Sequence, residues 1–260
     1  MFGISDVSSI PLRREPSEAS EMMTEILFGE HFEVLETIER WAKIKTVFDH
    51  YEGWIDKKMI VELSETEFQS INDKNTFVTQ NFVNRITNLA TSESFLIGGG
   101  SSIPNFDFQA KTFKIGKLVF VLNEEIKIDD SEIRQKIYNS AFQYLNSAYL
   151  WGGRNPMGID CSGLTQVSYK INGIAINRDA SQQVVHGTNV DFIGDAKLCD
   201  LAFFDNAEGR ITHVGLVLPD NKILHASGKV RIDTLDHQGI FNEQRKIYTH
   251  KLRVIKNILD

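Results

Sequence analysis

The sequence predicts an α+β domain in the last half of the chain, preceded by two small all-β domains. Two observations lead to this prediction. Short apolar runs with a period of two residues, separated by turn residues, fill the first half. From about residue 129, apolar residues recur at helical spacing instead, and strand-like segments follow the helices. We therefore place three domains, at 1–62, 71–127 and 129–260.

The composition is that of a soluble globular protein. The chain has 260 residues, of which 42% are apolar and 24% charged, enough for a substantial core. A formal charge of −7 argues against nonspecific nucleic-acid binding. Two cysteines do not suggest a disulfide framework. The first residues lack the basic and apolar stretches of a secretory signal, and no apolar run approaches the ~18 residues of a membrane span. We expect a cytoplasmic monomer that binds neither membrane nor nucleic acid.

The first half contains the segments expected to form strands. Closely spaced turns between them indicate small antiparallel barrels. An acidic stretch at 61–70 is expected to form a linker or a short helix. The cluster Gly98–Pro104 is read as a plain turn, because no Lys-Ser/Thr follows it as in a phosphate-binding loop. The strands are expected near 32–36, 41–47, 51–55, 77–79, 95–97 and 117–122.

The second half begins with two helices. Ile133, Ile137, Ala141 and Leu145 share one helical face, and an acidic Asp-Asp-Ser-Glu run precedes it. A second helix is expected from near Cys161 to the residues before Asn172-Gly173. Strands are expected at 200–204, 213–218, 222–226 and 247–255.

Cys161 is the candidate nucleophile. It stands at the start of the second helix, where unpaired backbone N–H groups and the helix dipole favour a thiolate. Asp160 before it and Ser162 after it could each cap the helix. Free cysteines are also commonly inert and buried, so this local context leaves both readings open.

Two histidines favour the catalytic reading. Pro219-Asp220-Asn221 has the chemistry of a three-residue hairpin loop that pairs Leu218 with Lys222. That register places His213 and His225 on one face of the sheet as diagonal neighbours, whereas a two-residue loop would separate them. His213 could then act as base toward the thiol, while His225 orients the His213 ring through its far nitrogen.

A metal site is the chemical alternative. Cys161, both histidines and Asp160 could in principle bind zinc, but no Cys-x-x-Cys or His-Glu-x-x-His motif supports this, and we predict no metal and no cofactor. Cys199 is read as a small packing residue. The remaining histidines are assigned structural roles: His31, His50, His186, His237 and His250.

In these residues the chain resembles the NlpC family of bacterial cysteine peptidases, papain-like enzymes that cut peptidoglycan stem peptides. The resemblance implies Cys161 as nucleophile, His213 as general base and His225 as the third, polar residue. One departure is Leu198-Cys199, where the family usually has Pro-Gly. The matching motifs are Tyr149-Leu-Trp-Gly-Gly153, Asp160-Cys-Ser-Gly-Leu164, Arg178-Asp-Ala-Ser-Gln-Gln183, Asp200-Leu-Ala-Phe-Phe204, His213-Val-Gly215 and His225-Ala-Ser227.

The first domain resembles a bacterial SH3-like domain, and the second would be a diverged one. Together they make the chain similar to γ-D-glutamyl-L-diamino acid endopeptidases of cell-wall recycling, in which the first SH3-like domain narrows the peptidase cleft. The resemblance implies that Tyr51 lines the alanine end of the cleft and that Asp179 pairs with the substrate ammonium. It further implies substrate-binding roles for Glu30, Trp151, Asp160, Ser162 and Ser181.

The expected function is hydrolysis of the γ-D-glutamyl–diamino acid bond in small wall peptides that have a free N-terminal L-alanine. Two alternatives stay open: an exported hydrolase of polymeric peptidoglycan, and a non-catalytic protein that binds wall peptides. Structural roles are the competing interpretation for three of the implied residues. Tyr51 could be a barrel core aromatic, Asp179 a loop cap, and Trp151 a core residue.

Overall fold

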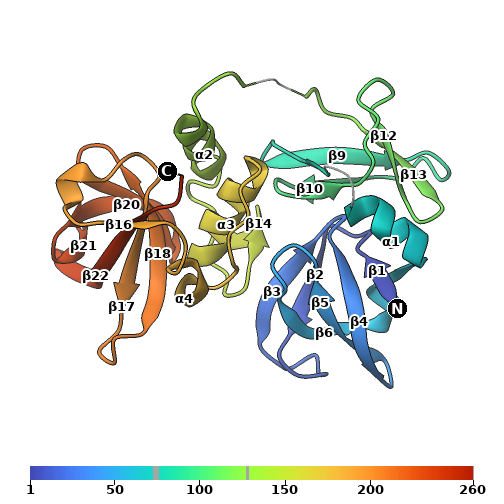
Figure 1. Ribbon diagram of the computed structural model, residues 1–260, viewed down its shortest axis with the longest axis horizontal. Helices are drawn as coiled ribbons and strands as arrows, with labels where there is room; N and C mark the ends of the chain where they lie inside the picture. Colours follow the sequence, from blue (N-terminus) through green and yellow to red (C-terminus); the bar gives the residue numbers. More distant parts are fainter. Residues whose placement is uncertain (73–75, 127–128, 260) are drawn as a thin grey trace. The chain divides into compact units, whose positions relative to one another are not determined.

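A computed structural model describes residues 1–72, 76–126 and 129–259 of the chain. The chain divides into two compact units. Unit 1 is Met1–Ile128 together with Arg154–Pro156, and unit 2 is Asp129–Gly153 with Met157–Asp260 (Figure 1). Each unit is described by itself.

Unit 1 begins with a twisted antiparallel sheet. Seven described strands form it, in the order β3-β2-β6-β5-β4-β1-β7. Alternate residues of β2 and β5 are buried, as the period of two predicts, and Ile10, Leu12, Ala42 and Ile44 form its core. The elements are β1 (Phe2–Ile4), β2 (Ser9–Arg13), β3 (Met22–Leu27), β4 (His31–Ile38), β5 (Trp41–Thr46), β6 (Glu52–Asp56), the 3₁₀ turn η1 (Lys57–Met59) and β7 (Val61–Leu63).

The rest of unit 1 shares a core with this sheet. A four-stranded sheet, β10-β9-β13-β12, and the short pair β11-β8 follow helix α1. Phe28, just after β3, makes edge contacts with Phe95, Phe113 and Phe120 of the second sheet. The two predicted barrels are therefore packed as one body with a continuous apolar cluster. The elements are α1 (Glu65–Asn72), β8 (Phe77–Val78), β9 (Val83–Asn88), β10 (Ser94–Gly98), β11 (Ser102–Ile103), β12 (Thr112–Ile115) and β13 (Leu118–Leu122).

The local predictions for the first half are largely confirmed. Each expected strand has a counterpart, and the 61–70 stretch forms β7 and the start of α1. Within the glycine cluster, Gly99 and Gly100 form the expected turn, whereas Ser102–Ile103 form the short strand β11. The structure does not describe residues 73–75 and 127–128, which lie near the predicted domain boundaries.

Three residues from the later sequence, Arg154–Pro156, belong to unit 1. They include β14 (Arg154–Asn155). The Arg154 guanidinium is buried and donates to both carboxylate oxygens of Glu30, at 3.0 and 2.9 Å. The Arg154 backbone N–H and the Asn155 side chain donate to Glu25. Such a buried ion pair is costly to break from one side, because the other charge is left without a partner.

Unit 2 opens with the two predicted helices. They are α2 (Ile133–Phe142) and α3 (Cys161–Ile171), which pack against each other. Leu145 lies beyond the end of α2, whereas Ile137 and Ala141 are fully buried in it. Helix α3 ends at Ile171, before Asn172 as predicted. Gly173 takes a positive φ of 78°, as a terminating glycine does.

The sheet of unit 2 closes on itself. The strand order is β16-β22-β17-β18-β19-β20-β21, and β22 also pairs with β21. Helices α3 and α4 pack against β18, and the barrel and its helices are seen in Figure 1. The elements are β15 (Gly158–Ile159), α4 (Ala180–Gln183), β16 (Thr188–Val190), η2 (Ile193–Asp195), β17 (Leu201–Asp205), β18 (Ile211–Leu218), β19 (Lys222–Ser227), β20 (Lys229–Asp236), β21 (Gly239–Asn242) and β22 (Ile247–Asn257).

Cys199 occupies a left-handed position just before β17. Its φ is 64°, a conformation in which glycine is unstrained, and its backbone carbonyl accepts from the buried Tyr169 hydroxyl at 2.7 Å. Its side chain is fully buried, in line with the predicted packing role.

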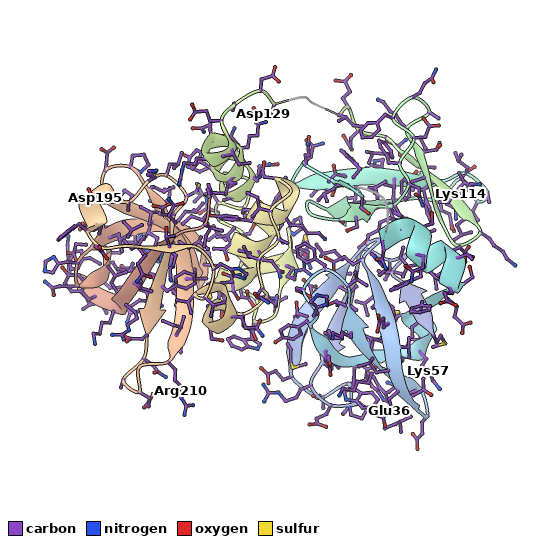
Figure 2. The ribbon with its side chains drawn as sticks, viewed as in Figure 1. Glu36, Lys57, Lys114, Asp129, Asp195 and Arg210 are labelled. Atoms are coloured by element: carbon purple, nitrogen blue, oxygen red, sulfur yellow. The ribbon has the colours of Figure 1, made fainter. Side chains whose placement is uncertain are left out.

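Charged side chains lie mainly on the outside of each unit. Asp195 and Arg210 of unit 2, and Glu36 and Lys57 of unit 1, are exposed examples (Figure 2). Among the helices that the structure describes, none has the length and apolar character needed to cross a bilayer.

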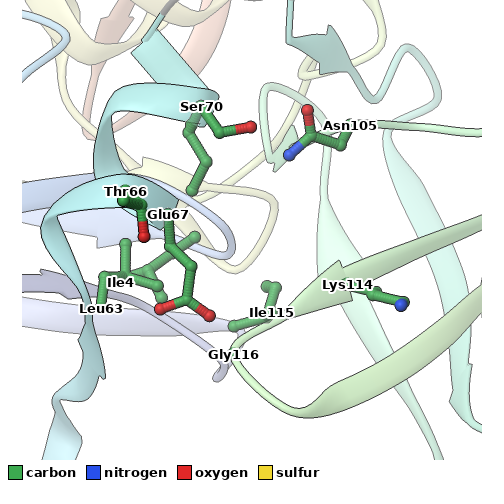
Figure 3. Close-up of a pocket in the computed structure, with 10 residues that line it drawn as sticks. Ile4, Leu63, Thr66, Glu67, Ser70, Asn105, Lys114, Ile115 and Gly116 are labelled. Atoms are coloured by element: carbon green, nitrogen blue, oxygen red, sulfur yellow. The ribbon is translucent and has the colours of Figure 1, made fainter.

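A pocket of about 260 Å³ opens within unit 1 between α1 and the β12–β13 hairpin (Figure 3). Glu67 and Thr66 line one side, and Lys114 and Gly116 the other. Its lining residues all belong to unit 1, whereas the predicted catalytic residues belong to unit 2.

Candidate active site

Cys161 is the first residue of α3 and is 7% exposed. The Asp160 side chain caps the helix by accepting from the Gly163 N–H at 2.7 Å. Backbone groups of Val214 and Ser162 hydrogen-bond the Cys161 thiol. Since Val214 follows His213 on β18, the thiol lies beside the strand that carries the predicted base.

The hairpin has the predicted register. Leu218 pairs with Lys222 across a three-residue loop, and the pairing continues to Leu216 and Leu224. A Cβ placed on Gly215 would meet the Cβ of His225 at 2.9 Å, so these two residues face each other as expected. His213 Nε2 lies 2.9 Å from His225 Nδ1. The two imidazoles therefore meet on one face, as the loop length predicted.

The protonation states differ from the expected thiolate–imidazolium pair. Burial raises the pKa of the Cys161 thiol to about 12, and the nearby Asp160 charge acts in the same direction. Backbone N–H groups and Arg178 lower that pKa, but by less. Burial also lowers the pKa of His213 well below its usual value, with His250 and His225 adding to the effect. Burial thus outweighs the backbone hydrogen bonds and the Arg178 charge that favour a thiolate, and both shifts favour a neutral thiol and a neutral imidazole in the resting site.

Two charged residues that were not predicted as site residues, Asp233 and Arg231, support His225. Its Nε2 lies 3.1 Å from Asp233 Oδ2, and Asp233 is paired with Arg231. His225 and Arg231 are opposite each other on β19 and β20, and Asp233 is two residues further along the same face. Asp233 was not among the predicted site residues, because no strand was predicted at the position of β20.

His250, which was predicted to be structural, is a third imidazole beside His213 and His225. Its ring stacks on that of His213, with centroids 4.0 Å apart and an interplanar angle of 21°. Burial lowers the pKa of His250 to about 4. His250 lies within the strand expected at 247–255. That strand pairs with β17, which also pairs with the strand of His213, so a predicted strand order could have brought the two histidines together.

The three imidazoles offer nitrogen atoms within 4.8 Å of one another, a spacing that invites a test for metal binding. A metal ion bonds in the plane of an imidazole ring. Because the rings of His213 and His250 are stacked, an ion in the plane of one ring is outside the plane of the other. The observed arrangement therefore does not present these two rings to one ion.

Asp160 and Ser162 fix the start of α3 through buried hydrogen bonds. Arg178, fully buried, donates to both carboxylate oxygens of Asp160, at 3.0 and 2.6 Å, and to the Ser162 hydroxyl at 2.9 Å. The Gly152 N–H also donates to Asp160, at 2.8 Å. Asp160 and Ser162, both predicted to bind substrate, thus anchor the nucleophile helix, and their partner is Arg178 of the Arg178–Gln183 motif.

Tyr149 is a further residue near the nucleophile. Burial raises the pKa of its phenol to about 12, and the nearby Cys161 and Asp160 act in the same direction. Trp151 is 59% exposed, which excludes the core role weighed for it.

Asp179 and Ser181 lie at the short helix α4. Asp179 forms a reciprocal capping box with Gln182 and is half-buried, less enclosed than the buried carboxylate expected. Ser181 is exposed. Gln183 of the same motif is buried and donates to the Ser162 carbonyl at 3.0 Å, which joins α4 to α3.

Tyr51 and Glu30 belong to unit 1. Tyr51 is half-buried and packs against the core of the first sheet. Glu30 is 3% exposed, and its carboxylate accepts from Arg154 and from the Leu27 N–H. Glu30 therefore has a structural ion pair where a substrate contact was predicted.

Comparison with known protein families gives one match mostly in unit 2 and one in unit 1. Residues 146–249 match the NlpC/P60 family, and residues 12–60 match the bacterial dipeptidyl-peptidase Sh3 domain. Dipeptidyl-peptidase 6 of Lysinibacillus sphaericus is 26% identical over 250 residues, which cover 87% of this chain and 89% of that protein. A gamma-D-glutamyl-L-lysine dipeptidyl-peptidase of Bacillus subtilis is 44% identical over 92 residues, which cover 35% of this chain and 30% of that protein.

The fold agrees with these matches. A crystal structure of an NlpC/P60 family protein from Bacillus cereus superposes with a TM-score of 0.83 and covers 100% of both chains, at 19% identity. An NlpC/P60 endopeptidase from Photobacterium damselae gives a TM-score of 0.68 over 99% of this chain and 71% of that one, at 14% identity. The chain therefore contains an NlpC/P60 domain at residues 146–249 and a bacterial SH3 domain at residues 12–60.

Proposed function

We propose that this protein is a cysteine peptidase that cuts the γ-D-glutamyl–diamino acid bond of small peptidoglycan peptides with a free N-terminal L-alanine. The observation that carries the proposal is the pair of imidazoles, 2.9 Å apart, on the strand hairpin beside the Cys161 thiol. The names of the relatives from Bacillus support the bond and the dipeptidyl product. A role in recycling wall peptides in the cytoplasm is part of the proposal.

The chemistry is acyl transfer from the D-glutamyl γ-carbonyl. The Cys161 sulfur bonds to the carbonyl carbon while its proton passes to His213. Because the resting thiol and imidazole are neutral, this transfer accompanies the attack. The Cys161 backbone N–H, at the start of α3, is the proposed oxyanion donor. His213 then gives the proton to the amine of the diamino acid as the C–N bond breaks, and activates the water that hydrolyses the thioester.

Selectivity for the free amine is assigned to Asp179. The ammonium of L-alanine would pair with its carboxylate, and an N-acylated peptide would leave that carboxylate without the pairing. Tyr51, in unit 1, is proposed to line the alanine end, as the resemblance implies.

The test is mass spectrometry of the products from two tripeptides, L-Ala-γ-D-Glu-diaminopimelate and L-Ala-γ-D-Glu-L-Lys, each with a free and an acetylated N-terminus. We expect L-Ala-γ-D-Glu and the free diamino acid from the unblocked peptides. Cys161→Ala should abolish turnover while peptide binding, measured by calorimetry, stays near that of the unchanged protein.

Three results would contradict the proposal. Retained hydrolysis by Cys161→Ala would exclude the nucleophile. Equal cleavage of blocked and unblocked peptides would exclude amine selectivity. Release of fragments from intact sacculi with no cleavage of the tripeptides would favour a hydrolase of polymeric wall.

A further inference from the structure

Four buried or half-buried groups on three adjacent strands form a continuous chain behind the nucleophile. His213 Nε2 lies 2.9 Å from His225 Nδ1, and His225 Nε2 lies 3.1 Å from Asp233 Oδ2. Arg231 completes the chain, with Nη2 2.9 Å from Asp233 Oδ1 and Nε 2.8 Å from Oδ2. We propose that Asp233 is a positioning residue that fixes the tautomers of both histidines and leaves His213 Nδ1 as the base.

The argument begins with the carboxylate, because an ionised Asp233 can only accept hydrogen bonds. His225 Nε2 must then carry a proton and donate it. A neutral His225 has its lone pair on Nδ1, so it accepts there, and His213 Nε2 must be the donor. His213 Nδ1 is consequently unprotonated. Asp233, which can only accept, thus sets the position of one proton on His225 and of one on His213, although these histidines are 12 residues apart.

Arg231 is the second partner of the Asp233 carboxylate. It already neutralises the Asp233 carboxylate through both oxygens. A second proton on His225 would place an additional positive charge in a site where His225 is fully buried and faces two more imidazoles, His213 and His250. Asp233, the acid that faces that charge, is already paired with Arg231, so the added charge would be only partly balanced and therefore unfavourable in a buried site. An imidazolium at His225 would also donate to His213 Nε2 and fill His213 Nδ1, which would remove the base.

The inference rests on the proposed function in one respect, that the proton accepted by His213 Nδ1 comes from Cys161. Asp233→Asn tests it directly. The amide can donate from Nδ2 to His225 Nε2, which moves the His225 proton to Nδ1 and the His213 proton to Nδ1. We expect kcat to fall by about 10²- to 10⁴-fold, as for the tautomer-breaking Asp→Asn change in a serine protease triad, with KM within about twofold.

Asp236→Asn is the matched control. Asp236 lies on the same strand and carries the same charge, but it accepts from Tyr248 and from the Gln238 N–H. We expect its kcat to stay within about twofold of the unchanged protein. Equal kcat values for the two variants, both folded by circular dichroism, would overturn the assignment.

A second measurement needs neither a variant nor a substrate. Long-range ¹H–¹⁵N correlation spectra of the full chain, labelled at histidine nitrogen, distinguish protonated from unprotonated ring nitrogens. We expect His225 and His213 each to carry a single proton, on Nε2. Two protons on His225, or one on its Nδ1, would overturn the inference. Because this measurement is made without peptide, failure of the tripeptide assay would count against the proposed function and leave the tautomer assignment standing.

Discussion

Asp179 combines two roles that a pair of substitutions separates. Its side chain takes part in the capping box of α4, and its charge is the proposed partner of the substrate ammonium. Asparagine caps helices about as well as aspartate, but it carries no charge. Asp179→Asn thus removes the charge alone, whereas Asp179→Ala removes both the charge and the cap.

For Asp179→Asn we expect kcat/KM on the unblocked tripeptide to fall by about 10- to 100-fold, the size of a lost charged hydrogen bond, with an unchanged melting temperature. Asp179→Ala should show the same kinetic loss and, in addition, lose about 1 kcal/mol of stability through the missing cap. Wild-type kinetics in Asp179→Asn together with a destabilised Asp179→Ala would mean that the residue is only a cap.

At the scale of elements, the β18–β19 hairpin shows what local sequence determines. Its loop chemistry predicted the register, and the register brought the two histidines together. The loop does so with two consecutive left-handed residues, Asp220 at φ 58° and Asn221 at φ 54°. Asparagine tolerates this conformation, whereas a β-branched residue is strained by it.

Asn221→Val should therefore destabilise the protein by about 1–2 kcal/mol, the cost of a left-handed conformation. Asn221 is exposed, so little packing is lost with its side chain. Asn221→Gly is the matched control and should stay within a few tenths of a kcal/mol of the unchanged protein. Urea unfolding measures both. Equal stabilities would show that the turn adopts another conformation in solution.

Strand β20 shows where local sequence is not enough. The run from Lys229 to Asp236 alternates in a way that suggests Ile232 inside and Asp233 outside, yet Ile232 is 38% exposed and Asp233 only 5%. The inversion depends on partners that pattern analysis does not see: His225 on the neighbouring strand and Arg231 on its own. A buried carboxylate is predictable only once its partners are placed.

The same limit applied to Cys161. Its place at a helix start predicted a lowered pKa, but enclosure by α3 and β18, a tertiary effect, raises that pKa.

At the scale of the whole molecule, the two buried thiols make stability depend on alkaline pH. Both cysteines of the chain are in unit 2, and burial raises the pKa of each thiol from its ordinary value of 9.0 to about 12. Above pH 9 the unfolded chain loses thiol protons that the folded chain keeps. The unfolded state then binds fewer protons, so the free energy of unfolding falls as pH rises from about 9 to about 12 and is insensitive to these thiols below that range.

The expected loss between pH 9 and pH 10 is about 1 kcal/mol per thiol, since one unit of pKa corresponds to about 1.4 kcal/mol once titration is complete. Urea unfolding at these two pH values measures it, and the Cys161→Ala/Cys199→Ala double variant is the comparison. The double variant will be less stable in absolute terms because side chains are removed from buried positions, but its stability should depend less on pH, by about 2 kcal/mol over this interval. The same pH dependence in both proteins would show that the thiols titrate alike in the folded and unfolded chains. Cys161 would then be an accessible thiol, and the neutral resting pair inferred for the active site would be wrong.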